Sequence, residues 1–179
     1  MRIGFDLDKI FINTPPFIPD FIISKLYMKK SNGLLLYRIP GKYEQLIRHI
    51  SHDPLFRPPI KENMNFLHSI AHDKNTLFLI SSRFSFLKKQ THKLVKIYKL
   101  DDAFHNIYFN FENNQPHIFK LEKIKKLELD KFVDDDLYLL KYIASRNNKT
   151  KLYWLNHKIN KSISKNIRAI TKISDVLTD

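Results

Sequence analysis

Apolar runs and helix-like segments alternate through most of this chain, and that alternation restricts its fold more than any other feature. The run TLFLI at 76–80 is almost wholly apolar, which is typical of a central parallel strand covered on both faces. Between such runs, apolar residues recur at helical spacing. The predicted strands span 2–6, 76–80, 106–109, 131–133 and 151–155, with a short edge strand at 168–170, and the predicted helices span 60–72, 85–98, 119–127 and 137–145. This order predicts an α/β fold with a doubly wound parallel sheet.

One segment interrupts the alternation soon after the first strand. Six of the eight prolines lie between Pro15 and Pro58, and they break this part of the chain into short pieces. Within it we predict helices at 17–28 and 42–50 and a turn at 29–33. We therefore expect residues 13–59 to form a small helical cap inserted after the first strand. Residues 1–12 and 60–179 would then form one Rossmann-like core domain.

The chain is strongly basic, with 31 Lys and Arg against 18 Asp and Glu and a net charge of +13. Such an excess can indicate nucleic-acid binding, but a compositional bias toward Lys, Asn, Ile and Phe explains it better. The positive residues are spread widely, and the most basic region, 149–172, has no recognisable nucleic-acid motif. Nucleic acid is therefore a possible partner but not a favoured one, and the sequence leaves the oligomeric state open.

The chain has no cysteine, which excludes disulfides and thiolate metal sites and fits a cytoplasmic protein. No apolar run approaches the roughly 20 residues that span a bilayer, and a charged motif follows the N-terminus at once. We expect a cytoplasmic protein with no membrane partner.

Two carboxylates, Asp6 and Asp8, follow the first predicted strand with one residue between them. At the end of a strand, residues i and i+2 point the same way, so both carboxylates would face one space. A shared cation relieves their repulsion, and Mg²⁺ prefers oxygen ligands. An ordinary solvated turn is the alternative, because Asp is common in turns.

Polar residues also follow the later strands. They are Ser81, Ser82 and Arg83 after the second strand and Asp134, Asp135 and Asp136 after the fourth, and Lys120, at the start of a predicted helix, joins them. Each has an ordinary alternative: Ser81 could cap a strand, Lys120 could be a solvated helix charge, and the three acids could begin a helix. Together, beyond the carboxyl ends of parallel strands, they describe a magnesium-assisted phosphoryl-transfer site.

The order of these groups resembles the motifs of the haloacid dehalogenase-like (HAD) hydrolase superfamily. The matching segments are Phe5-Asp6-Leu7-Asp8, Leu79-Ile80-Ser81-Ser82-Arg83, Lys120 and Phe132-Val133-Asp134-Asp135. They cover the chain apart from the insertion, whose position matches that of the family's cap. The last segment is similar to the paired-acid form of the fourth motif, which small phosphatases and nucleotidases carry.

The resemblance implies a role for each matching residue. Asp6 would be the nucleophile, Asp8 the general acid/base, and Ser81 a hydrogen-bond donor to the transferred phosphoryl group. Lys120 would balance charge, and Asp134 and Asp135 would complete a Mg²⁺ site with Asp6 and Asp8.

Two positions depart from the family pattern. Lys9 stands where the family usually has Gly, which permits a tight left-handed turn, so we expect an altered turn or a changed site entrance. Three consecutive acids, Asp134 to Asp136, leave open which pair faces the metal, and we favour Asp134 and then Asp135.

Our prediction is a HAD-like phosphatase that acts on a small phosphorylated metabolite, with nucleotides as one class of substrate. Ser82 and Arg83, with Arg38 and Arg57 of the cap, would bind the substrate, although solvated cap charge explains the last two equally well. The alternative is a catalytically impaired HAD-like module that binds nucleic acid or a protein through its basic surface.

Overall fold

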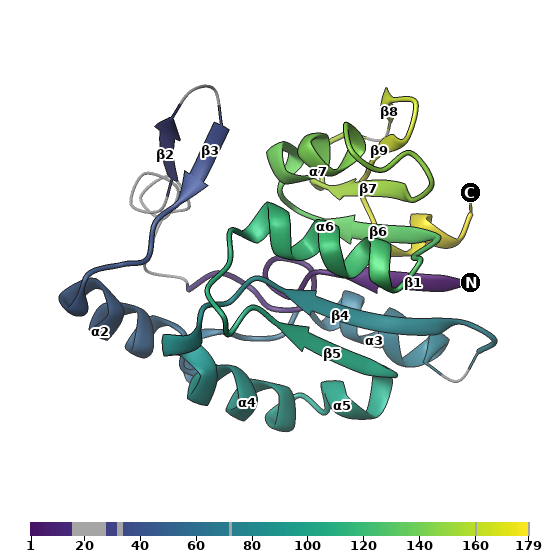
Figure 1. The fold of residues 1–179 in the computed structure, drawn as a ribbon. Helices are drawn as coiled ribbons and strands as arrows, with labels where there is room; N and C mark the ends of the chain where they lie inside the picture. Colours follow the sequence, from purple (N-terminus) through teal and green to yellow (C-terminus); the bar gives the residue numbers. More distant parts are fainter. Residues whose placement is uncertain (16–27, 32–33, 72, 160, 179) are drawn as a thin grey trace.

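The computed structural model describes residues 1–15, 28–31, 34–71, 73–159 and 161–178 (Figure 1). Its main feature is a seven-stranded sheet in the order β5-β4-β1-β6-β7-β9-β8. The strands are β1 (Arg2–Phe5), β4 (Thr76–Ser81), β5 (Asn106–Phe109), β6 (Lys131–Asp134), β7 (Lys151–Leu155), β8 (Lys161–Ser164) and β9 (Ile167–Ile170). All neighbouring pairs are parallel except β8 and β9. The predicted doubly wound α/β sheet is confirmed, with one antiparallel strand added at an edge.

Helices pack on both faces of this sheet, and strand side chains alternate between two apolar cores. The helices of the core domain are α3 (Lys61–Ile70), α4 (Lys88–Ile97), α5 (Leu100–Ala103), α6 (Pro116–Lys126) and α7 (Leu137–Ala144). Ile3 and Phe5 of β1 belong to the core that α3, α4 and α5 cover. Phe132 of β6 belongs to the opposite core, beneath α6 and α7. No helix in the described part of the chain is long and apolar enough to cross a membrane.

β1 lies inside the sheet, between β4 and β6, where the strand order reverses direction. Its register pairs Phe5 with Leu79 of β4 and with Val133 of β6. The next residue, Asp6, therefore leaves the sheet beside Asp134, and Ser81 ends the strand on the other side. In sheets of this kind, ligands bind beyond the carboxyl ends of the strands at this reversal.

Gly4 of β1 faces the core of α6 and α7 at very close quarters. A Cβ atom added there would lie 2.5 Å from a methyl carbon of Leu129 and 2.9 Å from the ring of Phe132. Glycine is therefore required at this position by packing.

We expect Gly4→Ala to lower the free energy of unfolding by about 1–3 kcal/mol, since an extra carbon in a packed core forces its neighbours to shift. Urea denaturation measures this loss. Gly41→Ala is the matched control, because the nearest atom to a Cβ there is a Glu44 oxygen at 3.7 Å. Equal losses in the two variants would show that Gly4 is not held by packing.

The predicted cap contains strands as well as helix. β2 (Met28–Ser31) and β3 (Leu34–Tyr37) form an antiparallel hairpin, and α2 (Lys42–Ser51) and a 3₁₀ helix at Pro54–Phe56 follow it. Figure 1 shows this hairpin standing apart from the main sheet. The predicted turn at 29–33 is wrong for its first three residues, because pairing with the apolar run of β3 makes them a strand.

The chain leaves and re-enters the core at one place. The amide of Asn13 donates to the Pro58 carbonyl at 2.9 Å, and the amide of Ile60 donates to the Phe11 carbonyl at 2.8 Å. This crossing supports our proposed boundaries for the insertion, 13–59. The predicted helix at 17–28 lies outside the described residues, apart from Met28, which begins β2.

Two further boundaries differ from the prediction. β9 is not an edge strand, because β8, whose short polar sequence gave no strand pattern, pairs with its outer side. Helix α6 begins at Pro116, with proline at its first position, so Lys120 lies in its second turn and not at its start.

Candidate active site

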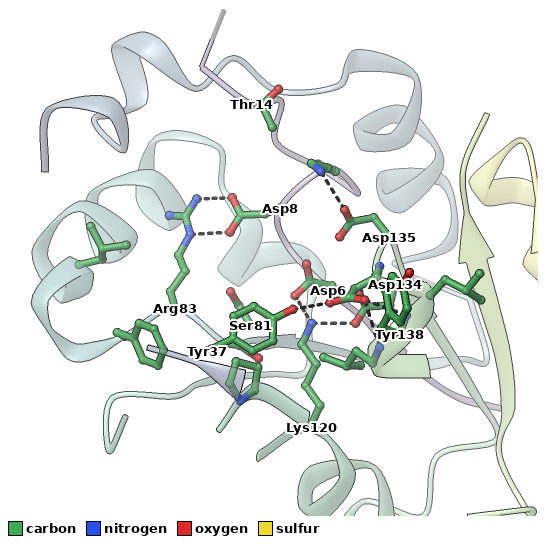
Figure 2. Close-up of a pocket in the computed structure, with 18 of the residues that line it drawn as sticks. Asp6, Asp8, Thr14, Tyr37, Ser81, Arg83, Lys120, Asp134, Asp135 and Tyr138 are labelled. Carbon is green, nitrogen blue, oxygen red and sulfur yellow. Dashed lines mark hydrogen bonds and ion pairs between the residues drawn. The ribbon is translucent and has the colours of Figure 1, made fainter. Parts of the chain in front are cut away.

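A cavity of about 640 Å³ opens at the carboxyl ends of β1, β4 and β6 (Figure 2). All the predicted site residues of the core domain line it: Asp6, Asp8, Ser81, Ser82, Arg83, Lys120, Asp134 and Asp135. Arg57 of the insertion lines it as well. The strand ends thus bring together residues up to 129 positions apart in the sequence.

Lys120 joins the carboxylates of β1 and β6. Its ammonium group donates to Asp6 Oδ1 at 2.8 Å and to Asp134 Oδ2 at 2.7 Å (Figure 2). All three side chains are buried, with exposed fractions of 5, 8 and 1 per cent. Burial disfavours the charge of this lysine, but Asp134 and Asp6 outweigh that and raise the pKa of Lys120, so the ammonium stays protonated. A buried, permanent positive charge therefore lies between two carboxylates.

The oxygens of Asp6, Asp134 and Asp135 lie within 4.8 Å of one another, close enough to share one metal ion. Burial raises the pKa of Asp6 and Asp134, and it raises that of Asp135 to about 7. The carboxylate charge here is only partly balanced by Lys120 and by Lys9, whose ammonium is 3.3 Å from Asp135. A hard divalent cation prefers such clustered oxygens, so these residues fit Mg²⁺.

Asp136 is the N-cap residue of α7. Its Oδ1 accepts hydrogen bonds from the amides of Tyr138 and Leu139 and so caps α7, at 2.9 and 3.1 Å. Of the three consecutive acids, Asp134 and Asp135 thus lie in the acidic cluster with Asp6, whereas Asp136 caps α7.

The carboxylate of Asp8 faces two guanidinium groups. Arg83 donates to it from Nε at 2.9 Å and from Nη2 at 2.7 Å (Figure 2). Nη2 of Arg57 also donates to Oδ1 of Asp8. Burial would raise the pKa of this carboxyl, but Arg83 and Arg57 prevail and hold the pKa well below its usual range. Asp8 thus lies in the same cavity as Asp6, but its carboxylate is held by Arg57 and Arg83, which we call the arginine clamp. It does not belong to the cluster of Asp6, Asp134 and Asp135.

The arginine clamp retains hydrogen-bonding capacity. Nε of Arg57, Nη1 of Arg83 and Oγ of Ser82 are buried without a hydrogen-bond partner among the described residues. Buried donors without acceptors are uncommon in folded proteins, and a bound anion would satisfy them. Arg38 lies elsewhere in the insertion and forms a two-pronged contact with Glu44.

Tyr37 of the insertion also lines the cavity. Its backbone amide and carbonyl exchange hydrogen bonds with the side chain of Gln115, both at 3.0 Å, and its hydroxyl donates to Asp136 (Figure 2). Burial and this acid raise the pKa of Tyr37, so the phenol remains a donor. The end of β3 is thereby fixed over the cavity.

The sequence has no match among protein-family models, and no curated protein matches it. Solved structures share its fold. A proposed β-phosphoglucomutase from Thermotoga maritima is 14% identical with a TM-score of 0.62, and the match covers 99% of this chain and 96% of that one. HAD-superfamily hydrolases from Ehrlichia chaffeensis and Geobacter sulfurreducens are 10% and 11% identical, with TM-scores of 0.56 and 0.57 and at least 93% of each chain covered. The resemblance that the motifs indicated is thus confirmed at the level of the fold.

Proposed function

We propose that this chain, which has the fold of the HAD-superfamily hydrolases, is a magnesium-dependent phosphomonoester hydrolase that acts through an aspartyl-phosphate. One observation carries the proposal: Lys120 holds Asp6 and Asp134 together at the strand ends, with Asp135 beside them. A carboxylate nucleophile, a buried ammonium and a cluster of oxygens for a cation are the groups that phosphoryl transfer requires.

In this mechanism Asp6 attacks phosphorus, and the bond to the leaving alkoxide breaks. Ser81 and Lys120 line the same cavity and would hold the phosphoryl oxygens. Asp6, Asp134 and Asp135 would hold Mg²⁺, which neutralises charge on the transferred group when bound. Water then hydrolyses the aspartyl-phosphate and restores Asp6.

Asp8 would protonate the leaving oxygen and later take a proton from the attacking water. The clamp by Arg57 and Arg83 favours the unprotonated carboxylate and so opposes the first of these roles. We infer that an anionic group of the substrate takes over the two guanidinium groups, which frees Asp8 to turn toward the reacting oxygen. The unsatisfied donors of both arginines support this exchange.

This arrangement predicts how the insertion contributes to specificity. Arg57→Ala should reduce kcat/KM about tenfold or more for a phosphomonoester with a second anionic group, such as a nucleotide. The loss on p-nitrophenyl phosphate, which lacks that group, should be smaller. Steady-state kinetics on both substrates measure the difference.

Arg38→Ala is the comparison variant. We expect it to act in the same direction but more weakly, because Glu44 already pairs with Arg38. If Arg57→Ala lost kcat/KM equally on both substrates, the change would have damaged the reacting centre. If it lost none on either substrate, Arg57 would have no role in substrate binding.

The test of the whole proposal is a broad phosphatase-substrate screen in the presence of MgCl₂ and, separately, of EDTA. Magnesium-dependent release of phosphate by the wild-type chain supports the proposal, and no release from any phosphomonoester contradicts it. The alternative of a catalytically impaired binding module rested on an altered turn at Lys9. Lys9 adopts φ 60°, the left-handed conformation that Gly would supply, so that argument loses its basis.

A further inference from the structure

Lys9 combines a strained backbone with a definite place at the site. Its φ of 60° is rare for a residue with a side chain. Its amide nevertheless donates to the Ile12 carbonyl at 2.8 Å and so closes the turn that follows Asp8. The turn therefore directs a long cationic side chain to the mouth of the cavity, which Lys9 lines.

That side chain meets the acidic cluster from the solvent side. The ammonium group of Lys9 is 3.3 Å from Oδ2 of Asp135, the outermost of the three clustered acids. Lys9 is 40 per cent exposed and Asp135 is 25 per cent exposed, whereas Lys120 and its two partners are buried. The three carboxylates are thus divided between two ammonium groups: Lys120 contacts Asp6 and Asp134 within the core, and Lys9 contacts Asp135 at its edge.

A metal ion can displace one of these ammonium groups from the carboxylates more easily than the other. Lys120 is fixed by two carboxylates in a buried site, where its displacement would leave an unsolvated charge. Lys9 is partly exposed and has a flexible four-carbon stem, so it can turn to solvent at little cost. A cation that takes an oxygen of Asp135 competes with Lys9 first.

We propose that Lys9 is a displaceable counter-ion of Asp135, which competes with Mg²⁺ and thereby sets the magnesium affinity of the site. The inference rests on the proposed function, since it assumes that Asp6, Asp134 and Asp135 hold that metal. Lys9 stands where the family that the motifs resemble usually has Gly, and the inference gives it an electrostatic role that is independent of the turn.

The experiment measures magnesium binding itself, by titrating MgCl₂ into the purified full chain in a calorimeter without any phosphate ester. Lys9→Gln removes the charge but keeps a side chain in the strained position, and Lys9→Gly removes both. Since exposed ion pairs are weak, we expect both variants to bind Mg²⁺ only about three- to tenfold more tightly than wild type. Lys9→Arg should keep the wild-type affinity.

Lys141→Gln is the matched control, because Lys141 lines the same cavity and carries the same charge. Its affinity should change by less than about twofold, since screening limits the effect of a cation outside the contact. Thermal melting of each variant with and without MgCl₂ shows that the chains compared are folded.

Each outcome decides the inference. Equal affinities in wild type and Lys9→Gln overturn it and leave the phosphatase proposal intact. Tighter binding in Lys9→Gly alone also overturns it, because backbone strain would then be the cause. If neither wild type nor any variant binds Mg²⁺, the inference is overturned, and so is the magnesium dependence in the proposed function. Tighter binding in both uncharged variants, in a chain that hydrolyses no phosphomonoester, supports the inference while the function fails.

Discussion

Asp6→Asn should reduce phosphatase turnover by at least about a thousandfold while the chain remains folded. The amide has the size of the carboxylate but lacks the charged oxygen that attacks phosphorus. Burial already disfavours the charged form of Asp6 and raises its pKa, so a neutral group at this position should cost little stability. Steady-state kinetics with MgCl₂ and thermal melting measure the two effects.

The matched control for this variant is Asp101→Asn, on the exposed side of α5, which should keep wild-type turnover. Intact-mass measurement must exclude deamidation back to Asp6, and the same purification from cells without the gene must be free of contaminating phosphatase. Turnover within a few-fold of wild type in a clean preparation would contradict a covalent mechanism at Asp6.

Lys120→Met should lower turnover by about a hundred- to ten-thousandfold, because the positive charge that faces both the nucleophile and the phosphoryl group is lost. It should also lower the free energy of unfolding by about 3–5 kcal/mol at neutral pH, since Asp6 and Asp134 would be buried together without a partner. Kinetics and urea denaturation measure these two losses.

The loss of stability in Lys120→Met should depend on pH. Without the ammonium, burial and mutual repulsion raise the pKa of Asp6 and Asp134 further in the folded state than in the unfolded chain. An acid whose pKa is raised by folding favours the folded state once it is protonated, so the destabilisation should shrink as pH falls from 8 to 5.

Lys125→Met, an exposed change of the same kind on the same helix, is the control for Lys120→Met and should alter neither activity nor stability. Equal stability of Lys120→Met and Lys125→Met across this pH range would show that Lys120 is not the counter-charge of the buried acids.

The sheet and most of the candidate site residues could be predicted because each rests on a local pattern. Apolar runs gave β4 and β7, and polar residues just after such runs gave Asp6, Ser81 and Asp134. Lys120 is different: it has the sequence context of a solvated helix charge, and only the order of the motifs selected it. In the structure α6 begins at Pro116, so Lys120 lies about one turn further along the helix than predicted, and its side chain is buried.

The contacts that the sequence did not predict join distant segments. Tyr37 and Gln115 are 78 residues apart, and neither has a local pattern that indicates their paired hydrogen bonds. The clamp on Asp8 combines the insertion's Arg57 with Arg83 of the core. Both arginines were predicted to bind substrate, but the sequence does not show that they would bind the carboxylate of Asp8.

Trapping the covalent intermediate is the measurement that bears most directly on the proposed mechanism. The chain would be mixed with MgCl₂ and a phosphomonoester it hydrolyses, quenched during turnover, reduced with borohydride and digested for mass spectrometry. An aspartyl-phosphate is an activated acyl group that borohydride reduces, so Asp6 should be recovered as homoserine and Asp8 and Asp134 unchanged. Asp6 recovered intact from a chain that is turning over, or homoserine at another aspartate, would contradict the mechanism.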